Sequence, residues 1–291
     1  MLPELWSRRE LILSLVRRDL KIRYKASVLG FLWSFCKPLL LMLVLYVVFA
    51  KFVPIRFQQP MAAPFALFLL SGILAWTYLA GCASESLFAI LGNASLVKKT
   101  YIPPEVFPVV TILSNLFHFL LALLVYFGLV LLFAWWSPDV KAPTWHVLFL
   151  PFVIALHTFF LFGLVLLLSA VNVFFRDIAS IMEVLLTAWF YLSPILYPLT
   201  EPYRRIVDAP AMPDWLFHLY MLNPMAPILA AYRKVLLLPA YGDVEFPFWP
   251  GAGHPLSLLV YLGVAVVTSA LLVLIGQAVF RHYAGRFADE I

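Results

Sequence analysis

Long stretches without a charged side chain are the feature that most restricts how this chain can fold. They cover residues 57–84, 106–138, 142–175, 184–200 and 246–280. An α-helix needs about 20 mostly apolar residues to cross the hydrocarbon core of a bilayer. Hydrophobic residues make up 64% of the chain and charged residues 12%, against roughly 45–50% and 25% in average soluble proteins. The sequence therefore predicts an integral membrane protein.

The charge-free stretches predict an all-α protein with six transmembrane helices. One of these helices starts near Val28 and contains Lys37, whose side chain lies near the helix end and can reach the headgroups. The expected spans are residues 29–52, 62–84, 107–134, 146–171, 181–199 and 256–279. An even number of spans places both termini on one side of the membrane, with residues 281–291 as a tail on that side.

The distribution of basic residues predicts which side this is, because loops on the cytoplasmic side carry an excess of Lys and Arg. On the side of the N-terminus lie Arg8, Arg9, Arg17, Arg18, Lys21, Arg23, Lys25, Lys37, Lys98, Lys99, Arg176, Arg281 and Arg286. The short loops of the other side hold Lys51, Arg56 and Lys141, and the long segment 200–255 adds Arg204, Arg205, Arg233 and Lys234. Both termini are therefore expected in the cytoplasm.

The segment before the last span is unusual in composition. Residues 194–255 contain half of the chain's 22 prolines, and residues 215–238 are apolar but interrupted by Asn223, Pro224 and Pro227. Such a stretch is too broken for an ordinary span. We expect short re-entrant helices on the outer side within residues 200–240, shielded by protein; an exposed irregular loop is the alternative.

The N-terminal residues 1–28 predict an amphipathic helix that lies in the cytoplasmic membrane interface. At about 100° per residue, one broad apolar stripe is formed by Leu5, Ile12, Leu13, Val16, Leu20 and Tyr24. A basic ridge on another side is formed by Arg17, Lys21 and Lys25, with Arg18 adjacent. The apolar side is expected in lipid and the basic side toward headgroups or a partner. Arg9 and Arg23 interrupt the stripe, and a plain lipid-anchoring helix remains an alternative.

Several kinds of chemistry have no matching motif. The sequence has no phosphate-binding G-x-x-x-x-G-K-[ST] loop and neither H-E-x-x-H nor C-x-x-C. Glu85, Glu183 and Asp177 lie at expected span ends, so the mid-membrane carboxylate typical of an ion-driven carrier is missing. His118 and His157 fall within spans, either as functional groups or as neutral imidazoles bonded to a neighbouring helix. The sequence indicates a membrane conduit without its own energy source or catalytic centre.

Six segments carry a resemblance to a known family: RDLKIRYKASVLGFLW (residues 18–33), NASLVKKTYIPPEVFP (93–108), AVNVFFRDI (170–178), SPILYP (193–198), LNPMAPI (222–228) and VFRHYAGRFADEI (279–291). Together they resemble the permease subunit of type-2 ATP-binding-cassette exporters, in the branch that exports O-antigen, capsule and teichoic acid polysaccharides. Each motif alone is weak, whereas their order and spacing over essentially the whole chain are specific. The resemblance implies a homodimer in the bacterial inner membrane that works with two nucleotide-binding ATPase subunits.

The resemblance also implies sites of contact with the ATPase. The loop between the second and third spans would dock on it through Lys98, Lys99, Tyr101, Pro103 and Glu105. Prolines make this turn compact, and Glu105 lies at a helix N-terminus, where a carboxylate is favourable. Arg176 and Asp177 would form a second contact. The alternatives are an ordinary positively charged loop and an ion pair that caps a span. No cofactor is expected on this chain, and ATP and Mg²⁺ would act through the partner.

The substrate implied is a lipid-linked glycan, with a polyprenyl diphosphate as the expected carrier. The basic residues Arg17, Arg18, Lys21 and Lys25 are candidates for an entrance that binds the phosphates, unless they only set the topology or contact the ATPase. Aromatic rings can stack on sugars, and the candidates for lining the pore are Phe31, Trp33, Phe35, Tyr46, Phe49, Tyr191 and Tyr197. Interfacial aromatic belts and helix packing are the alternative.

Three other functions compete with this reading. One is a type-2 exporter of a drug or small lipid, and another is a membrane-embedded glycan-modifying enzyme, which would need a His/Asp cluster. The third is an ion-coupled carrier, which would need mid-membrane carboxylates. Nucleic acid is not an expected partner.

Overall fold

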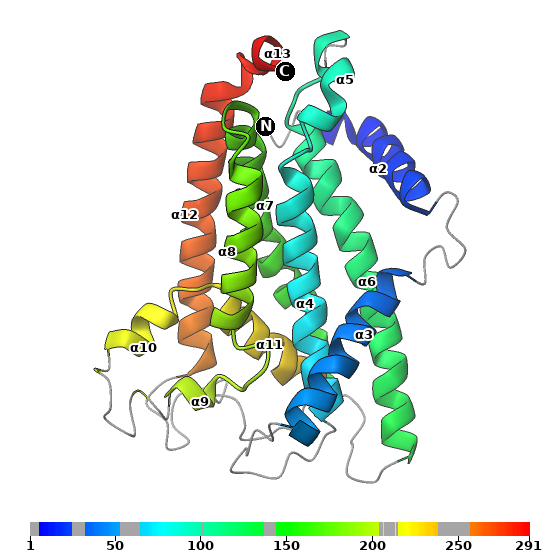
Figure 1. Cartoon of the computed structure of the whole chain (residues 1–291), viewed down its shortest axis with the longest axis vertical. Coiled ribbons are helices and arrows are strands. Elements are labelled where there is room, and N and C mark those ends of the chain that lie inside the picture. The colour runs from blue at the N-terminus through cyan, green and yellow to red at the C-terminus, as the bar shows by residue number, and fades with distance from the viewer. Residues whose placement is uncertain are drawn as a thin grey trace.

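The structure is a computed structural model, and it describes residues 6–24, 33–52, 65–99, 102–136, 144–203, 206, 213, 215–237 and 257–291. Within these ranges the regular secondary structure is entirely helical (Figure 1). The expected all-α class is therefore confirmed. Lys25, Phe31 and Tyr101 lie outside the described residues.

Four described helices are long and apolar enough to cross a membrane, judged by length and composition. They are α4 (Phe65–Ser86), α6 (Val106–Trp136), α7 (Leu150–Phe174) with the preceding turn η4 (Trp145–Phe149), and α12 (Leu258–Ala284). Even the shortest, with 22 residues, extends over about 33 Å at 1.5 Å per residue. Each overlaps one of the expected spans, because a charge-free stretch of this length has no other way to satisfy its backbone in lipid.

Two further apolar helices overlap the remaining expected spans, and the second of them ends earlier than the sequence predicts. The first consists of α3 (Trp33–Val47) and the π-helical turn η2 (Val48–Phe52). The second, α8 (Ile178–Leu192), was expected to continue to residue 199 but ends seven residues earlier. Ser193 adopts an extended backbone (φ −93°, ψ 145°), as the residue before a proline prefers, so Pro194 ends the helix.

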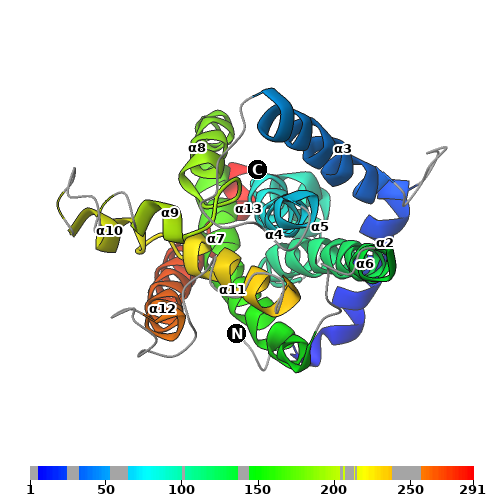
Figure 2. The same cartoon turned by 90° about the horizontal axis from the view of Figure 1, so that it is seen from below.

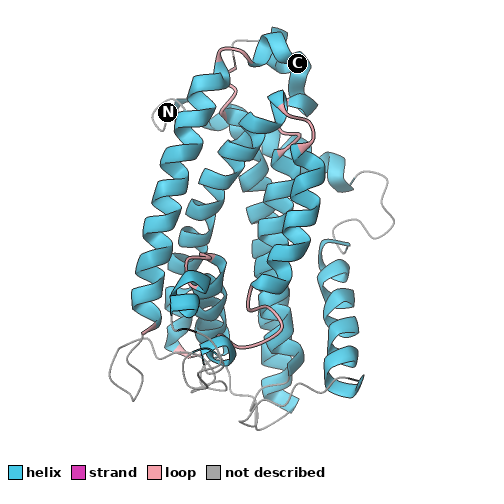
Figure 3. Cartoon of the chain, turned by 60° about the vertical axis from the view of Figure 1, so that its left-hand side comes forward, coloured by secondary structure: helices cyan, strands magenta, loops and turns pink. Residues whose placement is uncertain are grey.

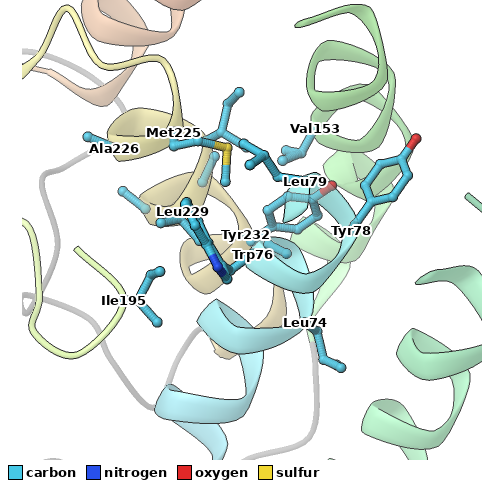
Figure 4. Close-up of a cluster of buried hydrophobic side chains, with 14 of the residues drawn as sticks. Leu74, Trp76, Tyr78, Leu79, Val153, Ile195, Met225, Ala226, Leu229 and Tyr232 are labelled. Carbon is cyan, nitrogen blue, oxygen red and sulfur yellow. The ribbon is translucent and has the colours of Figure 1, made fainter. Parts of the chain in front are cut away.

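The long helices form a bundle with α4 in its centre (Figure 2). Contacts join α4 to α3, α6, α7, α8 and α11 (Met225–Leu237), and most of its residues are buried. Figure 4 shows part of the resulting core, in which Trp76 and Leu79 of α4 meet Val153 of α7 and Leu229 of α11. The most extensive helix pair is α7 with α12. Their backbones touch at Gly163 and Gly276, because small residues allow close helix packing.

Three short helices lie at one end of the bundle (Figures 1 and 3), within the segment where the sequence predicts short helices. They are α9 (Thr200–Tyr203), α10 (Trp215–Tyr220) and α11. All residues of α11 are buried against α4, α7 and α12. The turn into α11 is closed by Asn223, which accepts from Trp189 Nε1 (2.9 Å) and donates to Ser193 Oγ (3.2 Å). Residues 225–237 of the interrupted apolar stretch are therefore core, and an exposed irregular loop is the wrong description of them.

The N-terminal helix α2 (Arg9–Tyr24) differs from its sequence description in what its apolar side contacts. Ile12, Leu15 and Val16 are buried in a cluster with Val106 and Val110 of α6. Leu13, which was assigned to the same stripe, is 52% exposed. The expectation that the apolar stripe lies in lipid is thus wrong for Ile12 and Val16, which α6 covers. A helical wheel identifies an apolar face but not whether lipid or protein covers it.

Candidate functional site

Several sequence-predicted residues gather at one end of the bundle, which we call the connector end. It comprises the connector between α4 and α6, which contains η3 (Leu91–Asn93) and α5 (Ala94–Lys99), the turn between α7 and α8, and α13 (Phe287–Glu290) (Figure 1). The helices α9 and α10 lie at the opposite end. Segments far apart in the sequence, near residues 95, 176 and 288, therefore share one end of the molecule.

The connector holds the predicted ATPase-docking residues. Lys98 is exposed, and its Nζ donates to the backbone oxygen of Ile291 (2.6 Å). The chain then turns at Pro103 and Pro104, whose carbonyl oxygens accept from the amides of Val106 (3.1 Å) and Phe107 (3.3 Å). Glu105 directly precedes α6. The compact turn expected from the two prolines is present. The side chain of Lys99 lies outside the description.

Some residues of the predicted basic ridge on α2 are exposed, whereas another forms hydrogen bonds within the protein. Arg17 and Lys21 are exposed and lie four residues apart, one helical turn. Arg18 instead donates from Nη2 to Asp19 Oδ1 (3.0 Å) and to Asn93 Oδ1 (2.9 Å) in the connector. Among the described residues of the ridge, Arg17 and Lys21 are therefore the exposed cations, while Arg18 joins α2 to the base of α5.

A polar cluster that the sequence reading did not find also joins α2 to the bundle. Arg23 Nη2 pairs with Glu85 Oε2 in the last turn of α4 (2.6 Å), and Asn115 Nδ2 of α6 donates to the same oxygen (2.7 Å). A Cβ at Gly81 would lie 2.7 Å from Asn115 Oδ1, so the glycine makes room for this side chain. Arg23 interrupts the apolar stripe because it faces the Glu85 carboxylate. In the sequence, this interruption was the signal that could have pointed to a buried or paired partner for Arg23.

Reversing the charge of Arg23 should loosen α2. In Arg23→Glu, two carboxylates would face each other, and we expect the α2 amides to exchange hydrogen several-fold faster in detergent. The double variant Arg23→Glu/Glu85→Arg restores opposite charges and should return exchange toward the parental rate. Arg17→Glu, on the exposed side of the same helix, is the control. Equal exchange in Arg23→Glu and Arg17→Glu would contradict the assignment. Both partners are about one-third exposed, so salt should weaken the effect.

Arg176 and Asp177 lie in the turn between α7 and α8, and both are exposed. Asp177 is the residue before α8 and its side chain makes no capping hydrogen bond. The turn is closed by backbone bonds from Ile178 to Phe175 (3.2 Å) and from Ala179 to Arg176 (3.3 Å). Their exposure at the connector end leaves both charged groups accessible to a partner.

The described aromatic candidates for lining a pore fall on α3, on η2, on α8 and just beyond α8. The helices α3 and α8 lie on one side of α4 (Figure 2). Trp33 is 45% and Tyr191 63% exposed. By contrast, Phe35, Tyr46 and Phe49 pack partly against the core. Tyr197 follows α8 and donates to the backbone oxygen of Tyr191 (3.3 Å). On α8, Met182 and Leu186 are the buried residues, so most of its surface is left for lipid or a second chain.

The histidines within the long helices pack among aromatic rings. His157 of α7 is fully buried, and its Nδ1 lies 3.4 Å from the Tyr232 hydroxyl of α11. Tyr78 meets the His157 ring edge-on, with centroids 4.9 Å apart. His118 of α6 is also buried, next to Phe117. His157 thus has the neighbouring-helix contact expected of a packed imidazole.

A buried arginine at the opposite end was not singled out from the sequence. Arg233 of α11 is 1% exposed, and its guanidinium donates to the backbone oxygens of Ile195 (2.7 Å) and Tyr197 (3.2 Å). Its Cζ lies 3.6 Å from the centroid of Phe68 in α4. Arg233 therefore fixes the turn that follows α8. In the sequence it counts only as a basic residue of a long outer segment.

The chain is similar to known membrane transport proteins along its length. The model of the ABC-2 type transporter family matches residues 10–237. The O-antigen export system permease protein RfbA of Myxococcus xanthus is 32% identical over 291 residues, covering 100% of this chain and 99% of the relative. A protein of the same name from Klebsiella pneumoniae is 28% identical, covering 96% and 94%. Together with its long apolar helices, these matches identify the chain as a multi-pass membrane protein that belongs to the ABC-2 type transporter family.

Proposed function

We propose that this chain is the permease subunit of an ATP-driven exporter, and that it moves a lipid-linked polysaccharide of the O-antigen type across the bacterial inner membrane. The observation that carries this proposal is the similarity to O-antigen export permeases over the whole chain. The connector end supports it, because exposed charged groups of α5 and of the α7–α8 turn lie at the same end of the bundle. The polysaccharide class distinguishes this function from export of a drug or small lipid.

The working unit in this proposal is a homodimer with two ATPase subunits. Each protomer contributes six spans, with α3 and α8 as the two short ones and both termini in the cytoplasm. The exposed apolar surfaces of α3 and α8 include Leu40, Leu43, Val184 and Leu185, which suits contact with a second copy or lipid. The short helices α9–α11 would form the outer, re-entrant region before the last span.

The polysaccharide would pass between α3 and α8 of the two protomers. Trp33 and Tyr191 are exposed on these helices, and flat aromatic faces can stack on sugar rings. Phe31, Phe35, Tyr46, Phe49 and Tyr197 remain candidates for the same path. Arg17 and Lys21 are the open cations for the phosphates of a polyprenyl-diphosphate carrier at the entrance. Arg18 and Lys25 complete this proposed group.

ATP hydrolysis would take place on the partner, which supplies the nucleotide and Mg²⁺ sites. The proposed docking group on this chain is Lys98, Lys99, Tyr101, Pro103, Glu105, Arg176 and Asp177. The helix α5 lies between the ends of α4 and α6 in the chain. A displacement of α5 by the ATPase would therefore act directly on two long helices.

Reconstituted export tests the function and the docking group together. The complex of this chain with its ATPase is placed in vesicles with a lipid-linked O-antigen-type glycan, and ATP-dependent delivery across the bilayer is measured. Like charges placed across an interface cost several kcal/mol, so Lys98→Glu/Lys99→Glu should reduce export by about tenfold or more. Membrane insertion should be unchanged.

Two controls sharpen this experiment. Arg281→Glu reverses an exposed charge of α12 outside α5 and should export at nearly the parental rate. A parental complex that moves a drug or small lipid but no glycan would refute the proposed substrate class. Unaltered export by Lys98→Glu/Lys99→Glu would refute the docking group alone.

A further inference from the structure

The orientation of α5 depends on what surrounds it. With six residues, α5 is far shorter than the roughly 12–15 residues that an isolated helix needs to be even marginally stable in water. Its base is bound where Asn93 accepts from Arg18 and donates to the Ala89 oxygen (2.9 Å). Its far end is bound where Lys98 donates to Ile291. The two ends of the helix are therefore held by different parts of the chain.

The segment 285–291 that supplies this second contact is itself firmly packed. The chain turns after α12 at Gly285 and Arg286 and forms α13. Phe287 is fully buried, and its ring centroid lies 5.2 Å from that of Phe280 in α12 and 6.1 Å from that of Phe174 in α7. The guanidinium carbon of Arg286 lies 5.5 Å from the centroid of Phe174. Segment 285–291 is thus anchored on the ends of two long helices.

One apolar cluster continues from this anchor to α5. Its buried members include Ile90 of the connector, Ala170 and Val173 of α7, Phe280 and Phe287, and Val97 of α5 and Ile291 pack against them. The helices α5 and α13 are in direct contact, and they lie together at the connector end (Figure 1). One packed cluster, with Phe287 among its buried members, therefore joins α7 and α12 to α5.

We propose that segment 285–291 is a positioning element that keeps α5 in the orientation needed to transmit the movement of the ATPase to the membrane helices. This inference rests on the proposed docking role of α5. The segment does not need to touch the nucleotide or the glycan. It acts through α5, since the bond from Lys98 and the packing of Val97 against the cluster set where α5 points.

Two variants remove the element to different degrees. Phe287→Ala removes the anchor, and Phe287→Leu keeps an apolar side chain of similar reach. Truncation after Ala288 retains Phe287 but removes Ile291, whose backbone oxygen accepts from Lys98. This second variant keeps the experiment informative if Phe287→Ala does not fold. Asp289→Asn, at an exposed position of α13, is the matched control.

The informative quantity is the number of ATP molecules hydrolysed per glycan exported in reconstituted vesicles. A purely structural defect would lower the amount of complex, hydrolysis and export together. Loss of the positioning element should leave hydrolysis within about twofold of parental while export falls by about tenfold. Phe287→Leu and Asp289→Asn should keep the parental ratio. An unchanged ratio in both Phe287→Ala and the truncated chain would overturn the proposal.

A second measurement does not depend on export. Hydrogen exchange of the α5 amides, recorded on the permease alone in detergent, should become about tenfold faster in the truncated chain, because a charge-assisted hydrogen bond is lost at the far end of the helix. Unchanged exchange would overturn the positioning role. If the parental complex exports no glycan, the proposed function fails and this exchange measurement still decides the role of segment 285–291.

Discussion

Gly163→Val should lower the free energy of unfolding by about 3 kcal/mol or more. A Cβ at this position would lie 2.6 Å from the carbonyl carbon of Leu272 and from the amide nitrogen of Val273 in α12. Both are backbone atoms of a long helix, so no side-chain rotation can relieve the clash. At Gly276, an added Cβ would in turn meet the carbonyl oxygen of Gly163. The contact between α7 and α12 thus requires glycine on both helices.

The loss of stability in Gly163→Val is expected to be large because the atoms in the way belong to the α12 backbone and cannot move on their own. Overpacking a well-packed core typically costs about 1–3 kcal/mol when side chains can move, and a whole protein is stable by about 5–15 kcal/mol. Separating α7 and α12 would disturb the largest helix pair of the described structure. We therefore expect Gly163→Val to lower the free energy of unfolding by about 3 kcal/mol or more. Size-exclusion profiles and thermal unfolding in detergent measure it.

Gly263→Val is the matched control for Gly163→Val. Gly263 also lies inside a long helix, α12, but a Cβ there would have no atom within 4 Å. The two substitutions change helix propensity equally, so their difference isolates the packing of α7 on α12. Equal unfolding temperatures for the two variants would show that the backbones do not approach as closely as the structure has them.

Arg233→Met should be the most damaging single substitution in the half of the molecule opposite the connector end. It removes two hydrogen bonds to the buried turn after α8, from the guanidinium to the oxygens of Ile195 and Tyr197. Pro194 and Pro198 of that turn have no N–H groups that could replace the lost donors. Hydrogen bonds to a charged group contribute about 1.5–3 kcal/mol each, so the variant should lose about 3 kcal/mol or more.

Arginine should not be replaceable by lysine at position 233. The fork of the guanidinium donates to two carbonyl oxygens, and its Cζ lies 3.6 Å from the centroid of the Phe68 ring. An ammonium group has no such fork and cannot reproduce this arrangement. We therefore expect Arg233→Lys to fall between the parental protein and Arg233→Met in unfolding temperature. Arg281→Met, at an exposed position of α12, is the control and should change little. Parental stability of Arg233→Met would contradict a clamping role for Arg233.

The sequence by itself determined the class of protein and most helix positions. The long apolar helices lie close to the expected spans. For the span expected at 62–84 the helix is Phe65–Ser86, and for the span expected at 256–279 it is Leu258–Ala284. These predictions succeeded because each depends on a local property, a charge-free run long enough for a bilayer. The two prolines of the connector likewise predict its compact turn from their own geometry. The resemblance to the exporter family, carried by short motifs in a fixed order, agrees with the family match over residues 10–237.

Only the tertiary structure decided which residues meet. Arg23 and Glu85 are 62 positions apart, Ile195 and Arg233 are 38 apart, and Lys98 and Ile291 are 193 apart. Periodicity shows that a side chain lies on one face of a helix, but it does not show which other helix covers that face. For this reason the sequence presented Arg23 as an interruption of an apolar stripe and Arg233 as a basic residue of a loop. It also predicted that the apolar side of α2 faces lipid. The physical reason is that packing partners are selected by the fit of whole helices, which no single stretch of the chain contains.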